Sequence, residues 1–311
     1  MQNQKVNLVN KALGSSKRQG SERLYTCPFC GHHKKKFSVN FELNVYKCWV
    51  CDARGRDIRR IIRRFGSFTD LKEWDQLSGI VDFSKHKFEL FPVKEEEVAQ
   101  RIDLPEEFKT LTGKITPADL RPFSYLQNRG LSKYDLLRYK IGYCSEGAYA
   151  GRIIIPSFDL DGYVNYFIAR TYNDHKVRYK NPSASKDIIF NELNIDWDSD
   201  VILVEGVFDA IFSDNSVALL GSTMREESKL FQQIIMNDSS VFIALDHDAE
   251  KKAMDIANTL LKYDVEVWMI EMPEGKDVAS IGKEQFRELK EQATLIHNNQ
   301  DLILRKRVMS L

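Results

Sequence analysis

Short apolar runs alternate with helical patterns along residues 201–283. The runs VILVEG, VALLG, VFIALD and VEVWMI are brief and continuous, which is typical of strands that are buried on both faces. Between them, residues 207–213, 225–236 and 249–263 have the apolar spacing of helices. This alternation predicts an α/β region with a parallel sheet in a chain that is α+β overall.

Acidic residues follow the strands of this predicted sheet. Glu205 comes after the first strand, and Asp277 lies in the loop after the last. Asp246 and Asp248 follow the third strand. Ligands collect at the carboxyl ends of parallel strands, so we expect these carboxylates to converge on one edge. Like charges so close are costly unless they hold cations, and hard oxygen ligands suit two or more Mg²⁺ or Mn²⁺ ions. Asp209, one helical turn after Glu205, is expected to cap the helix or orient the site.

The alternation of apolar and polar residues in 37–42 predicts a β-hairpin with Asn44 at its turn. The hairpin stands between two C-x2-C pairs that are separated by 17 residues. Two pairs at such a separation are typical of a zinc ribbon, in which each turn offers two thiolates to one ion. We predict one structural zinc ion with the ligands Cys27, Cys30, Cys48 and Cys51. Disulfides are the alternative, which a reducing compartment disfavours, and His32 or His33 could replace one cysteine.

Cations and aromatic rings are mixed around the second cysteine pair. The run Lys34, Lys35, Lys36 precedes Phe37, and Trp49 lies between the two cysteines of the pair. This mixture is typical of single-stranded nucleic-acid binding, through phosphate attraction and base stacking. We expect the lysines to contact phosphate, with a solvated surface as the alternative, and the two rings to fill the ribbon core. Further phosphate contacts are expected from Arg54, Arg56, Arg59, Arg60, Arg63 and Arg64.

The middle of the chain has helical signals and then strand signals. Residues 117–142 predict two short helices, with Ser132 as the cap of the second and Gly142 at its end. The apolar runs on either side of Asp161-Gly162 predict a β-hairpin over residues 151–172. Arg152 and Arg170 lie at matching ends of its two strands. Cations after this hairpin predict a phosphate-binding face, with a solvated charge run as the alternative. They are Lys176, Arg178, Lys180 and Lys186.

The composition has 45 Lys and Arg against 45 Asp and Glu among 311 residues, but the charge is unevenly distributed. Residues 1–70 hold 15 basic and 5 acidic residues, a net charge of +10, so the remainder carries −10. This asymmetry fits a basic module for nucleic acid joined to an acidic module for metal. With 43% hydrophobic residues, disorder is excluded. No apolar run predicts a membrane span or a signal peptide, so we expect a cytoplasmic protein without a membrane partner.

The acidic segments EGVFDA at 205–210, DHDA at 246–249 and GKD at 275–277 resemble the three signatures of the Toprim domain. The segments YLQNRGLS, LLRYKIGY, GRIIIP and VRYKNPSASKDIIF are similar to successive motifs in the catalytic core of DnaG-type DNA primases from bacteria and phages. A zinc ribbon at the amino end is also usual in that family. The resemblance spans residues 25–283, and the ligand set of four cysteines is closer to phage members.

This resemblance implies a DNA primase, a nucleotidyltransferase that joins NTPs into a short RNA primer on a single-stranded DNA template for DNA replication. Glu205 would be the essential acidic group, as metal ligand or proton acceptor. Asp246 and Asp248 would bind catalytic Mg²⁺ or Mn²⁺, and Asp277 would assist a further metal position. The resemblance also implies residues that hold template phosphate, triphosphate or the RNA–DNA hybrid, namely Arg152, Arg170, Arg178, Lys180 and Lys186.

The sequence departs from the family pattern after two of the acidic segments. Glu250 and Lys251 replace the usual small residues, and Val278 stands where proline is common. No phosphate-cradling G-x4-G-K-[ST] loop occurs, so we expect a separate replicative helicase to be a partner. Residues 284–311 are either a docking segment for that helicase or a closing helix of the sheet.

The predicted organisation is a zinc-ribbon DNA-binding domain, a linker, a basic subdomain of the primase core, a Toprim catalytic subdomain and a C-terminal helical segment. Their boundaries are 1–66, 67–98, 99–195, 196–283 and 284–311. The alternative function is a non-catalytic recombination mediator, which also pairs a four-cysteine zinc site with a Toprim domain. About 150 residues separate the two sites here and the carboxylate set is complete, which favours the primase.

Overall fold

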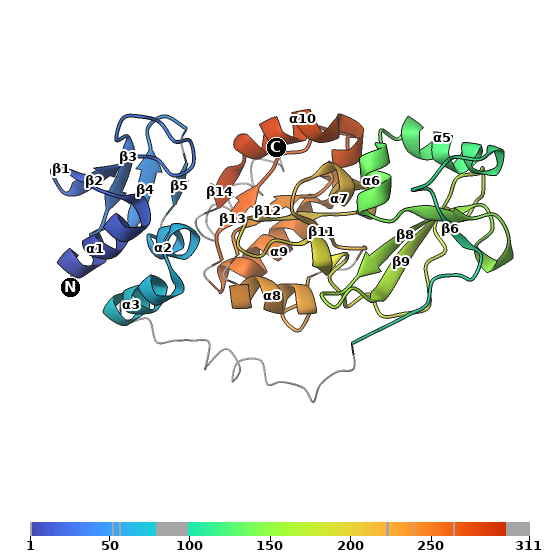
Figure 1. Ribbon diagram of the computed structural model, residues 1–311, viewed down its shortest axis with the longest axis horizontal. Helices are drawn as coiled ribbons and strands as arrows, with labels where there is room; N and C mark the ends of the chain where they lie inside the picture. Colours follow the sequence, from blue (N-terminus) through green and yellow to red (C-terminus); the bar gives the residue numbers. More distant parts are fainter. Residues whose placement is uncertain are drawn as a thin grey trace. The chain divides into compact units, whose positions relative to one another are not determined.

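The computed structural model describes residues 2–51, 53–55, 57–78, 99–221, 224–237, 239–263 and 265–296. The chain divides into two compact units, Met1–Val93 and Lys94–Leu311 (Figure 1). Their boundary falls inside the predicted linker of residues 67–98. None of the helices in the described part of the chain combines the length and the hydropathy that a transmembrane span requires.

The first unit contains an antiparallel sheet in the order β1-β2-β3-β4-β5. These strands are Lys17–Gln19, Glu22–Tyr25, Phe37–Asn40, Val45–Cys48 and Arg54–Gly55. The predicted hairpin is β3 and β4, in which Val39 pairs with Tyr46. Asn44 adopts a φ of 55° in the connecting turn, a left-handed conformation that asparagine tolerates better than most residues.

Helices α1 (Gln2–Leu13), α2 (Arg59–Phe65) and α3 (Phe68–Ser78) complete the core of this unit. Trp74 of α3 is only 2% exposed and belongs to the same apolar cluster as Phe37 of β3. Residues 68–78 were expected in the linker of residues 67–98, and this is corrected because burial of Trp74 makes α3 part of the first unit. The rest of that predicted linker, residues 79–98, lies outside the described residues.

The second unit begins with an antiparallel sheet in the order β6-β7-β8-β9. Its strands are Phe108–Thr110, Gly142–Cys144, Arg152–Phe158 and Val164–Thr171. The predicted hairpin is β8 and β9, with Gly162 at a φ of 83° in its loop. Helices α5 (Leu120–Asn128) and α6 (Lys133–Arg138) precede β7, and Ser132 caps α6 as predicted. Gly142 does not end that helix: it lies in β7, where a side chain would collide with Phe108 and the Lys109 carbonyl oxygen.

A second sheet of this unit has the order β11-β10-β12-β13-β14. Its strands in chain order are Val201–Val204, Ser216–Ala218, Val241–Ala244, Val267–Met269 and Thr294–Ile296. The strands β10 to β13 are parallel to their neighbours, as predicted, and β14 pairs antiparallel with β13. The segment 284–311 was expected to be helical, and β14 corrects this expectation for residues 294–296. Residues 297–311 lie outside the described residues.

Helices connect the strands of this sheet: α7 (Val207–Phe212), α8 (Lys229–Asn237), α9 (Glu250–Leu261) and α10 (Val278–Glu291). Figure 1 shows α7 and α10 on one face and α8 and α9 on the other. One apolar core runs from the hairpin sheet, including Ile153, into the parallel sheet, including Val204. The two sheets therefore support each other inside the second unit. Short 3₁₀ turns also occur at Pro117–Asp119, Gly147–Tyr149, Glu192–Asn194 and His247–Ala249.

Candidate metal and catalytic sites

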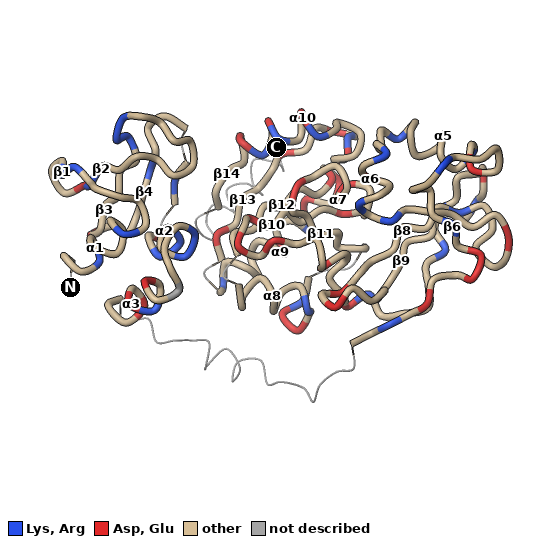
Figure 2. Tube along the Cα trace, in the orientation of Figure 1, with Lys and Arg blue, Asp and Glu red and all other residues tan. Residues whose placement is uncertain are grey.

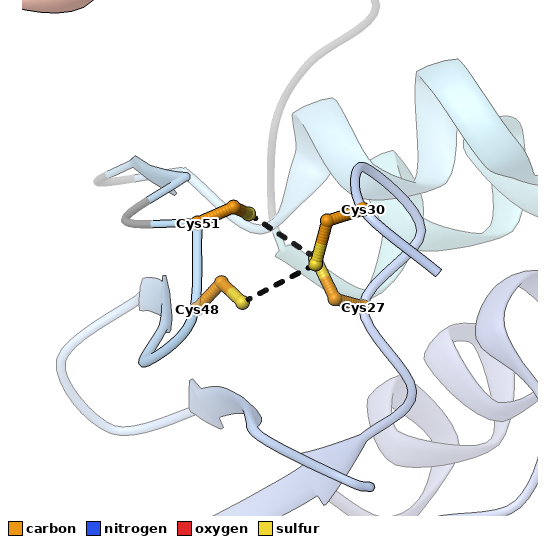
Figure 3. Close-up of side chains that lie close together, drawn as sticks. All are labelled: Cys27, Cys30, Cys48 and Cys51. Atoms are coloured by element: carbon orange, nitrogen blue, oxygen red, sulfur yellow. Dashed lines mark hydrogen bonds between the residues drawn. The ribbon is translucent and has the colours of Figure 1, made fainter. Parts of the chain in front are cut away.

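The four predicted zinc ligands come together in the first unit (Figure 3). Their Sγ atoms all lie within 4.8 Å of one another, with 3.7 Å between Cys27 and Cys51 and 4.0 Å between Cys30 and Cys48. Thiolates around a tetrahedral zinc ion with bonds of about 2.3 Å stand about 3.8 Å apart. All five cysteines, each within the described residues, are free thiols. The donor set and its spacing fit one structural zinc ion.

The protein environment shifts the pKa values of two of these thiols in opposite directions. Burial raises the pKa of Cys27 to about 12. Burial also disfavours the Cys48 thiolate, but the backbone N–H groups of Cys51 and Val50 outweigh it and lower the pKa of Cys48 to about 7. His32, the alternative ligand, accepts a hydrogen bond at Nδ1 from the Lys34 amide at 3.2 Å. The Nδ1 atom of His32 thus takes part in the local turn, and the four cysteines complete the ligand set without a histidine.

The carboxylates of the second unit lie at the switch point of the parallel sheet. Val204 pairs with Ala244, so Glu205 after β10 and Asp246 after β12 leave neighbouring strands at the same edge. The connection from β10 leads to β11 on one side, and the connection from β12 leads to β13 on the other. This is the point at which open α/β sheets bind ligands. The predicted convergence therefore follows from the strand order.

The acidic residues at this edge interact electrostatically with one another. The pKa of Asp246 is raised to about 6 by burial and by the negative charges of Glu205, Asp209, Asp277 and Asp248. Asp246 is half-buried, whereas Asp248 is exposed in the turn that precedes α9. Among the described residues, the cysteines form a close ligand group and these carboxylates do not come equally close together. The negative charges of these carboxylates repel one another, and a divalent cation bound by their oxygen atoms would offset that repulsion.

Asp209 has the orienting position that its spacing predicted. Its side chain is 8% exposed, and its Oδ2 accepts a hydrogen bond from the Gly206 amide at 3.0 Å. Its Oδ1 accepts from the Ala279 amide at 3.2 Å, which ties the start of α7 to the start of α10. Burial raises the pKa of Asp209. Asp277 caps α10 itself, because its Oδ1 accepts from the Ser280 amide at 2.7 Å.

We expect Asp209→Ala to lower the unfolding free energy of the second unit by about 1–3 kcal/mol, because two partly buried amide groups lose their acceptor. Urea unfolding followed by circular dichroism measures this loss. Asp255→Ala, at an exposed position of α9, is the matched control and should leave the midpoint nearly unchanged. An equal midpoint for both variants would show that the carboxylate does not hold the two helices together.

The predicted phosphate-binding arginines have two different environments. Arg152 is 5% exposed and donates to the carbonyl oxygens of Val177 at 3.0 Å and Arg178 at 3.2 Å. Burial lowers the pKa of Arg152. The buried Arg152 guanidinium therefore holds the backbone of residues 177 and 178 in place. This corrects the expectation that Arg152 contacts phosphate. Arg178 itself is exposed.

Arg170 lies beside the helix that follows Glu205. Its Nε donates to Tyr125 Oη at 2.7 Å, and its guanidinium also donates to the Tyr179 hydroxyl. Its Cζ is 5.4 Å from the centre of the Phe208 ring, and Arg129 Cζ is 4.4 Å from the same ring. Sequence reasoning did not single out these partners, although Tyr125 and Arg129 belong to the segment YLQNRGLS.

The predicted lysines lie at the surface of their units. Lys186 Nζ donates to the Leu220 carbonyl oxygen at 3.2 Å, which places it near the carboxyl end of β11. Lys180 Nζ donates to the Ala148 carbonyl oxygen at 2.7 Å. In the first unit, Lys34 and Lys36 are exposed, and Lys35 Nζ donates to the Ser15 hydroxyl at 2.9 Å. Figure 2 shows further basic positions along β4, β5 and α2. Among them, Arg59 forms an ion pair with Asp75 at 2.7 Å.

The expectation for the rings of the ribbon is correct for Phe37 and wrong for Trp49. Phe37 is fully buried, whereas 65% of Trp49 is exposed. Phe37 belongs to β3, which is covered on both faces, and Trp49 lies at the tip of the second cysteine turn. Both cysteines of that turn point to the metal site, so the residues between them are left outside the core.

Comparison with known proteins identifies relatives over most of the chain. The DNA primase of Clostridium acetobutylicum is 25% identical over 94% of this chain and 57% of its own length. The DNA primase of Legionella pneumophila is 24% identical over 90% of this chain and 58% of its own length. The chain thus spans little more than half the length of these curated relatives. No family model matches it.

A solved structure of the DnaG catalytic core covers 58% of this chain and 74% of that chain, with 20% sequence identity and a TM-score of 0.50. This similarity establishes a shared fold for the catalytic part. The curated relatives extend the similarity to nearly the whole chain, including the region of the zinc site. The chain is therefore similar to bacterial DNA primases over nearly its whole length and shares the fold of the DnaG catalytic core.

Proposed function

We propose that this protein is a DNA primase, which uses divalent metal to join ribonucleoside triphosphates into short RNA primers on single-stranded DNA. The observation that carries the proposal is the convergence of Glu205, Asp246 and Asp248 at the switch point of the parallel sheet. The basic zinc unit supports a nucleic-acid template, because its first 70 residues carry a net charge of +10.

The carboxylates would hold two or more Mg²⁺ or Mn²⁺ ions, with Asp277 assisting a further position. Ions bound there would lower the pKa of the attacking hydroxyl and neutralise charge on the leaving pyrophosphate. Asp209, which accepts hydrogen bonds from the Gly206 and Ala279 amides, would orient the start of α7 and so hold Glu205 in position relative to Asp246. Arg170 and Lys186 flank this edge and would bind triphosphate or template phosphates, and exposed Arg178 and Lys180 would extend that contact.

The proposal is tested by incubating the protein with single-stranded DNA, labelled ribonucleoside triphosphates and Mg²⁺ or Mn²⁺, and then sizing the RNA. Short RNA products that require both template and metal are expected. Reactions without template and with blunt duplex are the controls. DNA binding without any RNA product under these conditions would contradict the primase and favour the non-catalytic recombination mediator. We also propose that a replicative helicase is the partner that supplies the single strand, and that the reaction takes place in the cytoplasm.

A further inference from the structure

The tip of the second cysteine turn presents a large apolar surface to solvent. Trp49 is 65% exposed, and its neighbour Val50 is 50% exposed. The backbone beneath them is fixed, because Cys48 and Cys51 on either side belong to the four-cysteine site. A large ring on a rigid turn loses little conformational entropy when another molecule covers it. This surface is therefore suited to a contact.

Basic residues from three segments surround the backbone that carries this ring, and one of them contacts the ring itself. Lys47 Nζ is 4.9 Å from the centre of the Trp49 ring. The Trp49 amide donates to the Lys36 carbonyl oxygen at 3.0 Å, which brings the lysine run to the same place. Lys47 also pairs with Arg54 across β4 and β5. An exposed ring with the Lys47 ammonium group beside it and further basic residues on the adjoining segments matches the two parts of a nucleotide, an apolar base and an anionic phosphate.

We propose that Trp49 stacks on an unpaired base of single-stranded DNA while Lys36 and Lys47 contact the flanking phosphates. The identity of the strand rests on the proposed function. Charge complementarity supports a nucleic acid as the occupant, since residues 1–70 hold 15 basic and only 5 acidic residues. A single strand is required because the bases of a duplex are already stacked on each other and offer no free face to the ring.

The test uses the full chain with bound zinc and a fluorescently labelled oligothymidylate. Trp49→Ala should raise the Kd about tenfold, within the range found when a base loses its aromatic partner. Trp49→Phe, which keeps a ring, should recover most of the affinity. Leu43→Ala is the matched control, because Leu43 is 70% exposed at the opposite end of the same hairpin, and it should leave the Kd unchanged.

Salt dependence separates stacking from charge. Lys47→Met should reduce the slope of log K against log salt by about 0.7, because one fewer counterion is displaced from a single strand. Trp49→Ala should weaken binding at every salt concentration without changing that slope. A slope that changes for Trp49→Ala and not for Lys47→Met would overturn these assignments.

Equal Kd values for the wild type and Trp49→Ala would overturn the proposal, as would an equal loss of affinity for blunt duplex DNA. If Trp49→Ala loses zinc, tryptophan fluorescence decides the question. Quenching by oligothymidylate in the wild type that disappears in Trp49→Phe supports stacking, and quenching that persists contradicts it. These binding measurements need no catalysis, so an absence of RNA synthesis would overturn the proposed function without affecting this result.

Discussion

Asp246→Asn should reduce primer synthesis by at least about 100-fold while leaving single-stranded DNA binding within about twofold of the wild type. Burial and the negative charges of four other carboxylates raise the pKa of Asp246 to about 6. An amide of the same shape removes one negative charge and one oxygen ligand for divalent metal. The reaction would lose its cations while the DNA-binding surfaces stay intact.

The matched control is Asp255→Asn, at an exposed position of α9, the helix that follows the Asp246 turn. It makes the same chemical change outside the carboxylate group and should retain full activity. Initial rates of labelled RNA synthesis and fluorescence anisotropy with labelled single-stranded DNA measure the two effects separately. Undiminished synthesis by Asp246→Asn would remove Asp246 from the catalytic site.

The raised pKa of Asp246 adds a pH signature to this experiment. Protons compete with metal at this carboxylate, so the Mg²⁺ concentration for half-maximal activity should rise as the pH falls through about 6. Without added Mg²⁺ the folded protein binds this proton more tightly than the unfolded chain, whose aspartates titrate near 3.9. The contribution to stability is therefore complete below pH 3.9 and is lost as the pH rises through 6. The melting temperature of Asp246→Asn, measured as a function of pH, should lack this pH-dependent contribution.

Cys48→Ala should release the zinc ion and unfold the first unit. Cys48 is fully buried at the end of β4, and its Sγ lies 4.0 Å from that of Cys30. Zinc binding to such ribbons contributes on the order of 10 kcal/mol, and a unit with so small a core has little other stabilisation. Loss of one thiolate should therefore cost most of its folding free energy. Removal of zinc from the wild type by a chelator should have the same effect.

Cys144→Ala provides the control for this substitution. Cys144 is also fully buried, but it lies in β7 of the second unit, outside the four-cysteine group. Zinc content and limited proteolysis of residues 1–78 measure the outcome. The control should keep one zinc ion per chain and a resistant first unit, whereas Cys48→Ala should lose both. A Cys48→Ala protein that retains zinc and resists protease would show that the cluster is not the metal site.

The zinc site and the acidic edge were predictable because each depends on a pattern that the sequence displays directly. The cysteine pairs act through turns of four residues, and the hairpin between them brings the pairs together. The grouping of the carboxylates follows from a longer-range pattern. Buried strands alternate with helices, and a parallel sheet brings the carboxyl ends of its strands to one edge. The order of strands and helices along the chain is therefore enough to predict which edge of the sheet the acidic residues share.

The surroundings of these sites were not predictable in the same way. Asp135 and Lys283 form an ion pair at 2.8 Å although 148 positions separate them in the chain. This contact joins α10 of the parallel sheet to α6 beside the hairpin sheet. In the sequence, Arg152 is not distinguishable from the other basic residues of this region. In the folded protein, packing around β8 buries it.

The amino-acid sequence was enough to predict the four cysteine ligands, the acids at the strand ends and the separation of charge between the two ends of the chain. These features depend on local spacing, on the hydrophobic period and on residue type. The tertiary fold was needed to find that α3 belongs to the first unit, that β14 closes the second sheet, that Arg152 is buried and that Trp49 is exposed. Burial is set by which distant segments cover a residue, and neither local spacing nor residue type contains that information.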